Sequence, residues 1–251
     1  MKRHNYLIDS YFSTDVGRVR LVNEDQVTIL FNKNGEILML VCDGMGGQNK
    51  GDYASNLTLK FISEKFKKKK ESLSIVTTRI WLEEIINKAN KLVFSTGESS
   101  SIYKGMGTTI VAAIIRKNNI VIVNAGDSRA YMYKDKVLNK LSVDHSVVER
   151  LKQYGKINEN EANKRLDKNV LTNALGIYPS ISFNSKIYKY NNEPILLCSD
   201  GIFNNLSDRE IIEIISLKIS AKDKVIKMIA NANRNGGSDN LSVAYLERKD
   251  S

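Results

Sequence analysis

The sequence is poor in cysteine, histidine and proline, and each shortage excludes a class of protein. Its 251 residues include two cysteines, Cys42 and Cys198, which lie in apolar runs without a Cys or His at metal-ligand spacing. A disulfide scaffold or a zinc site is therefore not expected, and both thiols should be buried and reduced, as in a cytoplasmic protein. His4 and His145 are the two histidines and no Gly-x-Ser-x-Gly turn is present, so a Ser-His nucleophile is not expected either.

Long apolar segments and linker-like segments are also missing. The longest apolar run covers residues 110–115, well short of the ~20 residues that a membrane helix needs, and residues 1–6 lack the apolar core of a signal peptide. The two prolines form no Pro-rich stretch, and no Gly/Ser-rich linker or solenoid repeat interrupts the chain. We therefore expect one domain over residues 1–251, cytoplasmic and without membrane association, with 42% hydrophobic residues to build its core.

The net charge of +10 raises the hypothesis of nucleic-acid binding. Lysines are scattered along the whole chain, however, and the one dense run is Lys65-Phe66-Lys67-Lys68-Lys69-Lys70. This run closes a predicted helix, where cations suit the negative end of the helix dipole, so we interpret it as a solvated helix end. A surface for an anionic partner is the alternative. Nucleic-acid binding itself requires clustered Lys/Arg interleaved with aromatic residues, which the scattered pattern does not provide.

Periodic apolar residues divide the chain into blocks of strands and helices. Asn34-Gly35 between two strand-like runs predicts a hairpin that ends at Asp43. Strands are predicted at 26–31, 36–42, 108–116, 120–125, 130–133, 137–141, 181–190, 195–198 and 241–246. Helices are predicted from about Tyr53 onward and around 81–93, 147–154, 159–165, 208–217 and 222–232. The strands between 108 and 141 are expected to form one antiparallel meander.

This order of elements predicts an α+β fold. Antiparallel strand blocks interrupted by helical pairs favour two antiparallel sheets packed together and flanked by helix pairs, a four-layer α-β-β-α sandwich. The polar segment 144–171 is predicted to be a flap-like insertion, and such insertions often cover a site.

The end of the second predicted strand carries the first candidate site residue. Asp43 stops the apolar run 37–42 and is followed by Gly44, Gly46 and Gly47. A carboxylate at the end of a buried strand is costly without a partner, and the glycines allow backbone carbonyls and a ligand to approach closely. A tight turn containing an aspartate is the alternative, so the interpretation depends on matching acids elsewhere.

Matching acids do occur at other strand ends. Asp200 and Asp127 each follow an apolar run, Asp239 precedes the last predicted strand, and Asn23-Glu24-Asp25 precedes the first. Such a set of oxygen donors without clustered His or Cys selects Mg²⁺ or Mn²⁺ over Zn²⁺. Cations would also explain how close carboxylates coexist, and two ions ~3.5 to 4 Å apart can activate a water and clamp an in-line displacement at phosphorus. The sequence therefore predicts phosphoester hydrolysis.

At this point the motifs resemble a known family, the metal-dependent PPM (type 2C) serine/threonine protein phosphatases, with the bacterial branch most similar. The resemblance covers residues 9–247 in the right order and spacing. The matching segments are 14–25, 41–47, 105–109, 125–131, 143–146, 171–176, 198–201 and 237–240. It implies a β-sandwich flanked by helix pairs, with a metal centre at one end.

The resemblance also implies roles for individual residues. Asp43 would bridge two metal ions, Gly44 would offer its carbonyl to one of them, and Asp200 and Asp239 would complete the shell of the other. Glu24 would belong to the acidic first or second shell. Asp127, with Asp200, resembles the acids that hold a third and weaker ion in bacterial members. Two Mn²⁺ or Mg²⁺ ions, with a third in addition, are thus the expected cofactors.

Three further positions are read in the same way. Arg20 falls where the family places its phosphate-binding arginine, and a guanidinium fork suits a phosphate, although a surface ion pair is the alternative. Met45 stands where animal members have a histidine proposed as general acid, so the leaving alkoxide would be protonated by something else, such as metal-bound water. His145 is expected to have a structural hydrogen-bonding role at the start of the flap rather than that of the acid.

The leading hypothesis is a monomeric phosphatase that acts on phosphoserine and phosphothreonine in proteins. Phosphorylated proteins, and a bacterial Ser/Thr kinase whose action the enzyme opposes, are the partners that the resemblance implies. A catalytically silent phosphoprotein-binding module on the same fold is the alternative from another class. It predicts a missing metal aspartate, and none is missing.

Overall fold

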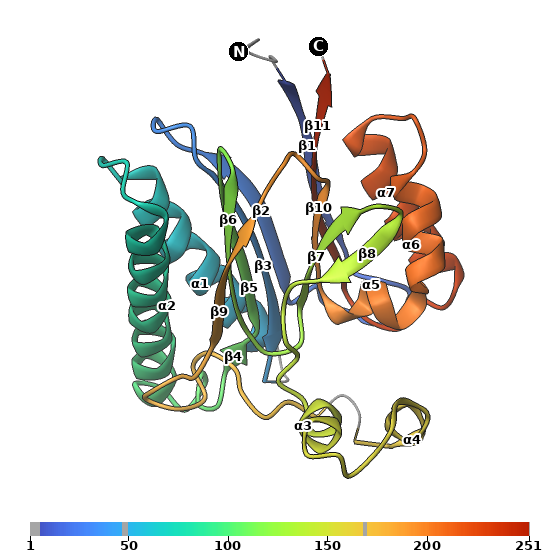
Figure 1. The fold of residues 1–251 in the computed structure, drawn as a ribbon. Coiled ribbons are helices and arrows are strands. Elements are labelled where there is room, and N and C mark those ends of the chain that lie inside the picture. The colour runs from blue at the N-terminus through green and yellow to red at the C-terminus, as the bar shows by residue number, and fades with distance from the viewer. Residues whose placement is uncertain (1–5, 47–49, 168–169, 251) are drawn as a thin grey trace.

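The computed structural model describes residues 6–46, 50–167 and 170–250. Two antiparallel β-sheets lie face to face, and helices cover the outer face of each, so the four-layer α-β-β-α sandwich expected from the sequence is confirmed (Figure 1). The segments that begin at Tyr6 and end at Asp250 lie side by side and extend from one end of the sandwich, and the two short helices Val147–Gln153 and Glu159–Lys164 project from the other.

The first sheet joins the two ends of the chain. Its strand order is β1-β11-β10-β7-β8. The strands are β1 (Tyr6–Asp15), β11 (Leu241–Asp250), β10 (Ile195–Cys198), β7 (Arg129–Lys134) and β8 (Val137–Lys140). β1 pairs with β11 over its whole length, from Tyr6 opposite Asp250 to Asp15 opposite Leu241.

The second sheet has the order β2-β3-β5-β6-β9, with the short β4 paired to the end of β3. Its strands are β2 (Asp25–Phe31), β3 (Ile37–Met45), β4 (Gly107–Thr108), β5 (Ile110–Arg116), β6 (Asn119–Ala125) and β9 (Asn184–Lys189). The predicted hairpin at Asn34-Gly35 joins β2 to β3, and Gly35 takes the positive φ of +70° that the turn needs.

The centre of the fold is β3, whose two faces are both buried. Met39 and Val41 belong to the core between the sheets, whereas Leu38, Leu40 and Cys42 pack against the outer helices. This position explains the uninterrupted apolar run, because a strand covered on both faces needs apolar residues at every position. It also places Asp43 directly after the buried part of β3, Ile37 to Cys42.

Helices cover the outer faces. On the second sheet lie α1 (Lys50–Lys67) and α2 (Ile75–Glu98), and on the first lie α5 (Asp200–Asn205), α6 (Asp208–Ile215) and α7 (Ala221–Arg234) (Figure 1). The starts of α2, α6 and α7 are fixed by serine caps, of which Ser207 forms a reciprocal capping box with Glu210.

The segment 144–171 contains the two short helices expected there, α3 (Val147–Gln153) and α4 (Glu159–Lys164). A bridge between Ser146 and Leu171 closes its base, and α3 and α4 lie outside the sandwich in Figure 1. We call residues 144–171 the flap.

Three expectations about the secondary structure were wrong or incomplete. The strands from 108 to 141 do not form one meander, because β5 and β6 belong to the second sheet and β7 and β8 to the first. The chain changes sheets between Ala125 and Arg129. Sequence reasoning also missed β1 and α5. β1 lies at a sheet edge with Leu7, Ile8, Phe12 and Thr14 exposed, and α5 is only six residues long.

The lysine run is not entirely solvated, which corrects the expectation for Lys69. Its side chain is 3% exposed and its Nζ lies 2.8 Å from Oε2 of the buried Glu36. Arg116 contacts the same carboxylate, and the indole of Trp81 lies against the Lys69 ammonium. Lys67, Lys68 and Lys70 are exposed.

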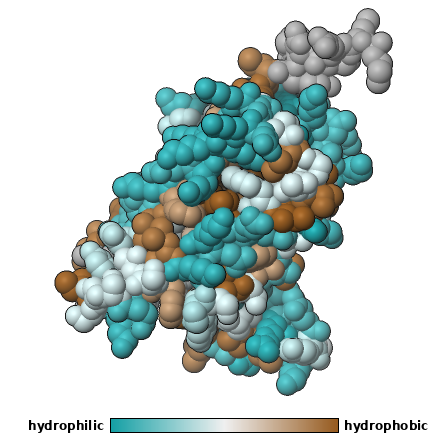
Figure 2. Space-filling model, turned by 90° about the vertical axis from the view of Figure 1, so that its left-hand side faces the viewer, coloured by the Kyte–Doolittle hydropathy of each residue, from teal (hydrophilic) through white to brown (hydrophobic). Residues whose placement is uncertain are grey.

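The outer face over α1 and α2 is mainly hydrophilic with scattered apolar side chains (Figure 2). Among the described residues, no helix is both long enough and apolar enough to span a membrane. Cys42 and Cys198 are free thiols and are buried, as expected.

Candidate metal centre and active site

A cavity of about 510 Å³ opens where the carboxyl ends of β3 and β10 meet the loops that precede β2 and β11. Every residue proposed from the sequence as a ligand or phosphate contact lines it. The lining consists of Arg20, Glu24, Asp43, Gly44, Met45, Gly46, Thr109, Asp127, Val170, Leu171, Asp200, Asp239 and Asn240. Residues that lie up to 220 positions apart in the sequence are thus brought to one place.

The backbone of Asp43 is held by two threonines of the neighbouring chain segment. Its N–H donates to Thr109 Oγ1 at 3.0 Å, and its carbonyl accepts from Thr109 N at 2.8 Å and from Thr108 Oγ1 at 2.9 Å. Thr109 Oγ1 in turn lies 2.7 Å from Ser128 Oγ, next to Asp127. These contacts fix the direction in which the Asp43 carboxylate leaves the strand.

Gly44 meets the start of α1 closely. A Cβ on Gly44 would lie 2.2 Å from the carbonyl oxygen of Gly51, so no larger residue fits without backbone movement. Glu24 joins the two segments, because its carbonyl accepts from Gly44 N at 3.2 Å and its Oε1 accepts from Gly51 N at 3.1 Å. Glu24 is therefore held next to Gly44 through its backbone carbonyl and next to Gly51 through its carboxylate.

The acids of the cavity raise one another's pKa. Removal from solvent, followed by the charges of Asp25 and Asp200, holds the pKa of Asp43 well above its usual range. The pKa of Asp127 is raised to about 8 by desolvation and by Asp200, and that of Asp200 to about 6 by desolvation and by Asp239. Carboxylates in this arrangement favour any cation, whether protons or a metal ion.

Asp25 is an acid of the site that the sequence-based residue assignments missed. It is 1% exposed and pairs directly with Asp43 across β2 and β3. Its Oδ2 accepts from Ser199 Oγ at 2.7 Å, whereas its Oδ1 has no hydrogen-bond partner among the described residues. Burial raises its pKa to about 7. The contiguous Asn23-Glu24-Asp25 motif was the available signal, but only the strand pairing shows which acid faces inward.

Arg20 reaches the cavity and binds one of the acids. Its Nη2 lies 2.7 Å from Asp239 Oδ2, and its side chain is 52% exposed. The ion pair considered as an alternative is thus present, although its partner is a predicted metal ligand at the cavity wall. The Arg20 side chain as a whole remains about half exposed while its guanidinium binds Asp239.

His145 lies away from these acids. Its backbone N–H donates to Gly126 O at 2.9 Å, and its carbonyl accepts from Thr172 N at 2.8 Å. The ring contacts Asn184 through Nε2 and Asn173 through Nδ1, and it lines a different pocket. These contacts support the structural role expected for His145, whereas Met45 lies at the cavity itself.

The donor set fits hard divalent cations by its chemistry. Among the described residues, four aspartates and one glutamate line the cavity without a cysteine or histidine, and the thioether of Met45 is a poor ligand for hard cations. Carboxylates this close together need protons or other cations to neutralise them. In the part of the chain that the structure describes, no three His, Cys, Asp or Glu side chains form a ready-made metal-binding group. The acids surround the cavity, and Arg20 holds Asp239 to one side.

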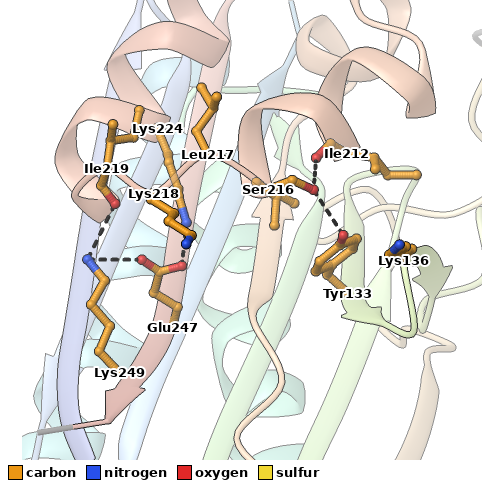
Figure 3. A pocket seen from close by; sticks show the side chains of 11 residues that line it. Tyr133, Lys136, Ile212, Ser216, Leu217, Lys218, Ile219, Lys224, Glu247 and Lys249 are labelled. Carbon is orange, nitrogen blue, oxygen red and sulfur yellow. Dashed lines mark hydrogen bonds and ion pairs between the residues drawn. The ribbon is translucent and has the colours of Figure 1, made fainter.

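A larger cavity, of about 770 Å³, lies elsewhere between α6, α7 and the β7–β8 hairpin (Figure 3). Its principal polar groups already bind one another: Lys224 Nζ lies 2.5 Å from Glu247 Oε2, and Lys249 Nζ lies 3.3 Å from Glu247 Oε1. Tyr133 OH and Ser216 Oγ form a further pair at 2.9 Å. The larger volume therefore does not identify the candidate active site, because the acids with raised pKa values line the smaller cavity.

A two-sheet sandwich with an acid-lined cavity at one end is compatible with a hydrolase, and comparison with known proteins shows the family. The sequence model of the protein phosphatase 2C family matches residues 17–244. The chain belongs to the protein phosphatase 2C family and is a serine/threonine phosphatase. The resemblance seen in the motifs is thereby confirmed.

Individual relatives span nearly the whole chain. The serine/threonine phosphatase stp of Listeria monocytogenes is 37% identical over 94% of both chains. The structure of a serine/threonine phosphatase of S. agalactiae superposes with a TM-score of 0.91, at 30% identity, over 96% of this chain and 99% of that one. The catalytic domain of the phosphatase PstP, solved in complex with two manganese ions, has a TM-score of 0.85 at 26% identity, over 98% of this chain and 100% of that one.

Proposed function

We propose that this phosphatase hydrolyses phosphoserine and phosphothreonine in proteins with the help of two Mn²⁺ or Mg²⁺ ions, and that a third ion binds near Asp127 and Asp200. The observation that supports this most is the convergence of Asp43, Asp200, Asp239 and Asp127 on one cavity that also contains Arg20. The two manganese ions of the PstP neighbour support the same proposal.

The proposal gives each of these residues a role. Asp43, Gly44, Asp200 and Asp239 would hold the two cations, with Glu24 and the buried Asp25 completing the acidic surroundings. When bound, such ions lower the pKa of water and neutralise charge on a phosphoryl group. Arg20 would bind the phosphate through its accessible face, because a guanidinium matches two phosphate oxygens at once.

The proton for the leaving group comes from solvent in this proposal. Within the described residues, no histidine lines the cavity, and Met45 occupies the position next to Gly44 without a titratable group. The turnover rate should therefore not depend on protonation of a histidine.

We further propose the cellular setting from the resemblance. The enzyme would act as a cytoplasmic monomer, as one catalytic domain with the flap as part of it, and would oppose a bacterial Ser/Thr kinase. Its substrates would be phosphorylated proteins, and neither nucleic acid nor membrane would be a partner.

Turnover of a phosphothreonine peptide tests the metal requirement. After treatment with chelator the protein should be inactive, and added Mn²⁺ or Mg²⁺ should restore phosphate release, with Ca²⁺ as the comparison ion. Undiminished turnover in chelator would overturn the two-metal proposal. Metal-dependent binding of the peptide without phosphate release would instead favour the phosphoprotein-binding module.

A further inference from the structure

The loop that carries Arg20 displays an unusual amount of apolar surface. Val19 is 65% exposed, Leu21 98% and Val22 38%, so three of the four residues 19–22 present aliphatic side chains to solvent. Single exposed aliphatic residues are common on protein surfaces, but three of them lie here within two positions of Arg20, the proposed phosphate contact.

This loop is held firmly in place. Asn240, which is 6% exposed, donates through Nδ2 to the carbonyls of Val16 at 2.9 Å and Val22 at 3.0 Å, and its Oδ1 accepts from Glu24 N at 2.9 Å. Arg18 N donates to Gly237 O at 2.8 Å. The backbone on both sides of Arg20 is thus anchored by hydrogen bonds to the loop that precedes β11.

Close packing at Gly17 fixes the loop further. Gly17 has a φ of +81°, and a Cβ there would lie 2.2 Å from the carbonyl oxygen of Asp239. The Arg20 loop and the Asp239 loop therefore form one unit, and the exposed aliphatic residues keep a constant position relative to the cavity.

The flap adds an apolar residue to the same cavity. Val170 is 51% exposed and lines the cavity together with Arg20 and Asp43. Val170 thus lines the acid-lined cavity directly, whereas Val19, Leu21 and Val22 lie beside the cavity-lining Arg20 in the chain.

We infer that this rim, formed by Val19, Leu21, Val22 and Val170, binds apolar side chains next to the phosphorylated residue of a substrate protein. The inference rests on the proposed function and names its substrate class: phosphoserine or phosphothreonine flanked by aliphatic or aromatic residues. Consecutive Cα atoms of a substrate chain are about 3.8 Å apart, so the residues next to the phosphorylated one stay close to a phosphate bound at Arg20. Val19 and Leu21 are the chain neighbours of Arg20.

A pair of peptides tests this preference. They share one sequence around phosphothreonine but carry either leucine or serine on both sides of it, and kcat/KM is measured for each with Mn²⁺. The wild-type protein should favour the leucine peptide by about fivefold to tenfold, because an open rim buries less apolar surface than an enclosed pocket. The ratio between the two peptides is the readout, so a general change in activity does not affect it.

Variants then assign the preference to the rim. Combined Val19→Ser and Leu21→Ser substitution should bring the ratio close to one, and Leu21→Met in the wild-type background should preserve it. The matched control is Val137→Ser, which removes a 53% exposed valine from the distant β7–β8 hairpin and should leave the ratio unchanged.

The outcomes separate the two proposals. If the wild-type protein turns over both peptides equally, or if the preference survives in the rim variant, the inference is overturned and the phosphatase proposal stands. If neither peptide releases phosphate with Mn²⁺, both the proposed function and the inference that rests on it are overturned.

Discussion

The guanidinium of Arg20 and the carboxylate of Asp239 are 2.7 Å apart, although 219 residues separate them in the sequence. One is the expected phosphate contact and the other an expected metal ligand. The ion pair therefore holds the substrate-binding group against the wall of the metal cavity, and cation binding at Asp239 would release the guanidinium for the phosphate.

Replacing Arg20 with alanine should weaken substrate binding more than turnover. Loss of a charge-assisted hydrogen bond of about 1.5–3 kcal/mol corresponds to a KM that rises roughly tenfold to a hundredfold with a smaller change in kcat. Steady-state kinetics on a phosphothreonine peptide measure both constants. Arg18→Ala is the control, since Arg18 lies in the same loop but does not line the cavity. An unchanged KM in the folded Arg20 variant would reduce Arg20 to a surface ion pair.

Asp43→Asn should abolish most of the activity without unfolding the protein. Asparagine preserves the shape and the backbone contacts to Thr108 and Thr109 but removes the charge, so the loss should reach about a hundredfold or more in kcat. Circular dichroism and thermal melting check the fold, and Asp135→Asn in the exposed β7–β8 turn serves as the matched substitution. Turnover near the wild-type level would show that Asp43 does not bridge the ions.

Asp127 should make the chelator-treated protein less stable as the pH rises. Its pKa is about 8 in the folded state and about 3.9 in an unfolded chain, so the folded protein retains a proton that the unfolded chain releases. The contribution of Asp127 to the free energy of unfolding is therefore greatest below about pH 4 and decreases as the pH rises to about 8.

The Asp127→Asn variant isolates that contribution. The free energy of unfolding of the variant relative to the wild type should increase by about 1–3 kcal/mol between pH 5 and pH 8. Linkage allows at most ~1.4 kcal/mol for each pH unit in this range. Urea unfolding at several pH values in the presence of chelator measures this difference. Parallel curves for the two proteins would mean that Asp127 ionises normally in the fold.

The buried pair of Lys69 and Glu36 should contribute to stability but not to catalysis. It lies where β3 begins, at the other end of the strand from Asp43. Lys69→Met leaves Glu36 buried with Arg116 and Asn32 as its remaining partners, and should cost up to about 3 kcal/mol of unfolding free energy.

Lys70→Met provides the matched control, since the neighbouring lysine is exposed and its loss should change stability by less than about 0.5 kcal/mol. Thermal or urea unfolding compares the two variants, and both should retain normal kcat. Equal stability of the two variants would show that the buried ion pair is energetically neutral.

The sequence by itself determined the fold class and predicted residues that the structure brings to one cavity. Apolar runs that stop at Asp43, Asp127 and Asp200 are local patterns, because a strand and the residue after it are contiguous in the chain. Their shared chemistry indicated a cation site, and the spacing of the motifs indicated the family. Alternation of strand and helix periods was sufficient for the four layers.

Only the tertiary structure decided which neighbours each segment meets. β1 pairs with β11 from the other end of the chain, and the change of sheet after β6 depends on packing between elements that are distant in sequence. The burial of Asp25 opposite Asp43, and of Lys69 against Glu36, depends on the same non-local contacts. A sequence pattern shows which side chains are apolar or charged. The partner that compensates a buried charge depends on tertiary contacts between segments that are distant in the sequence.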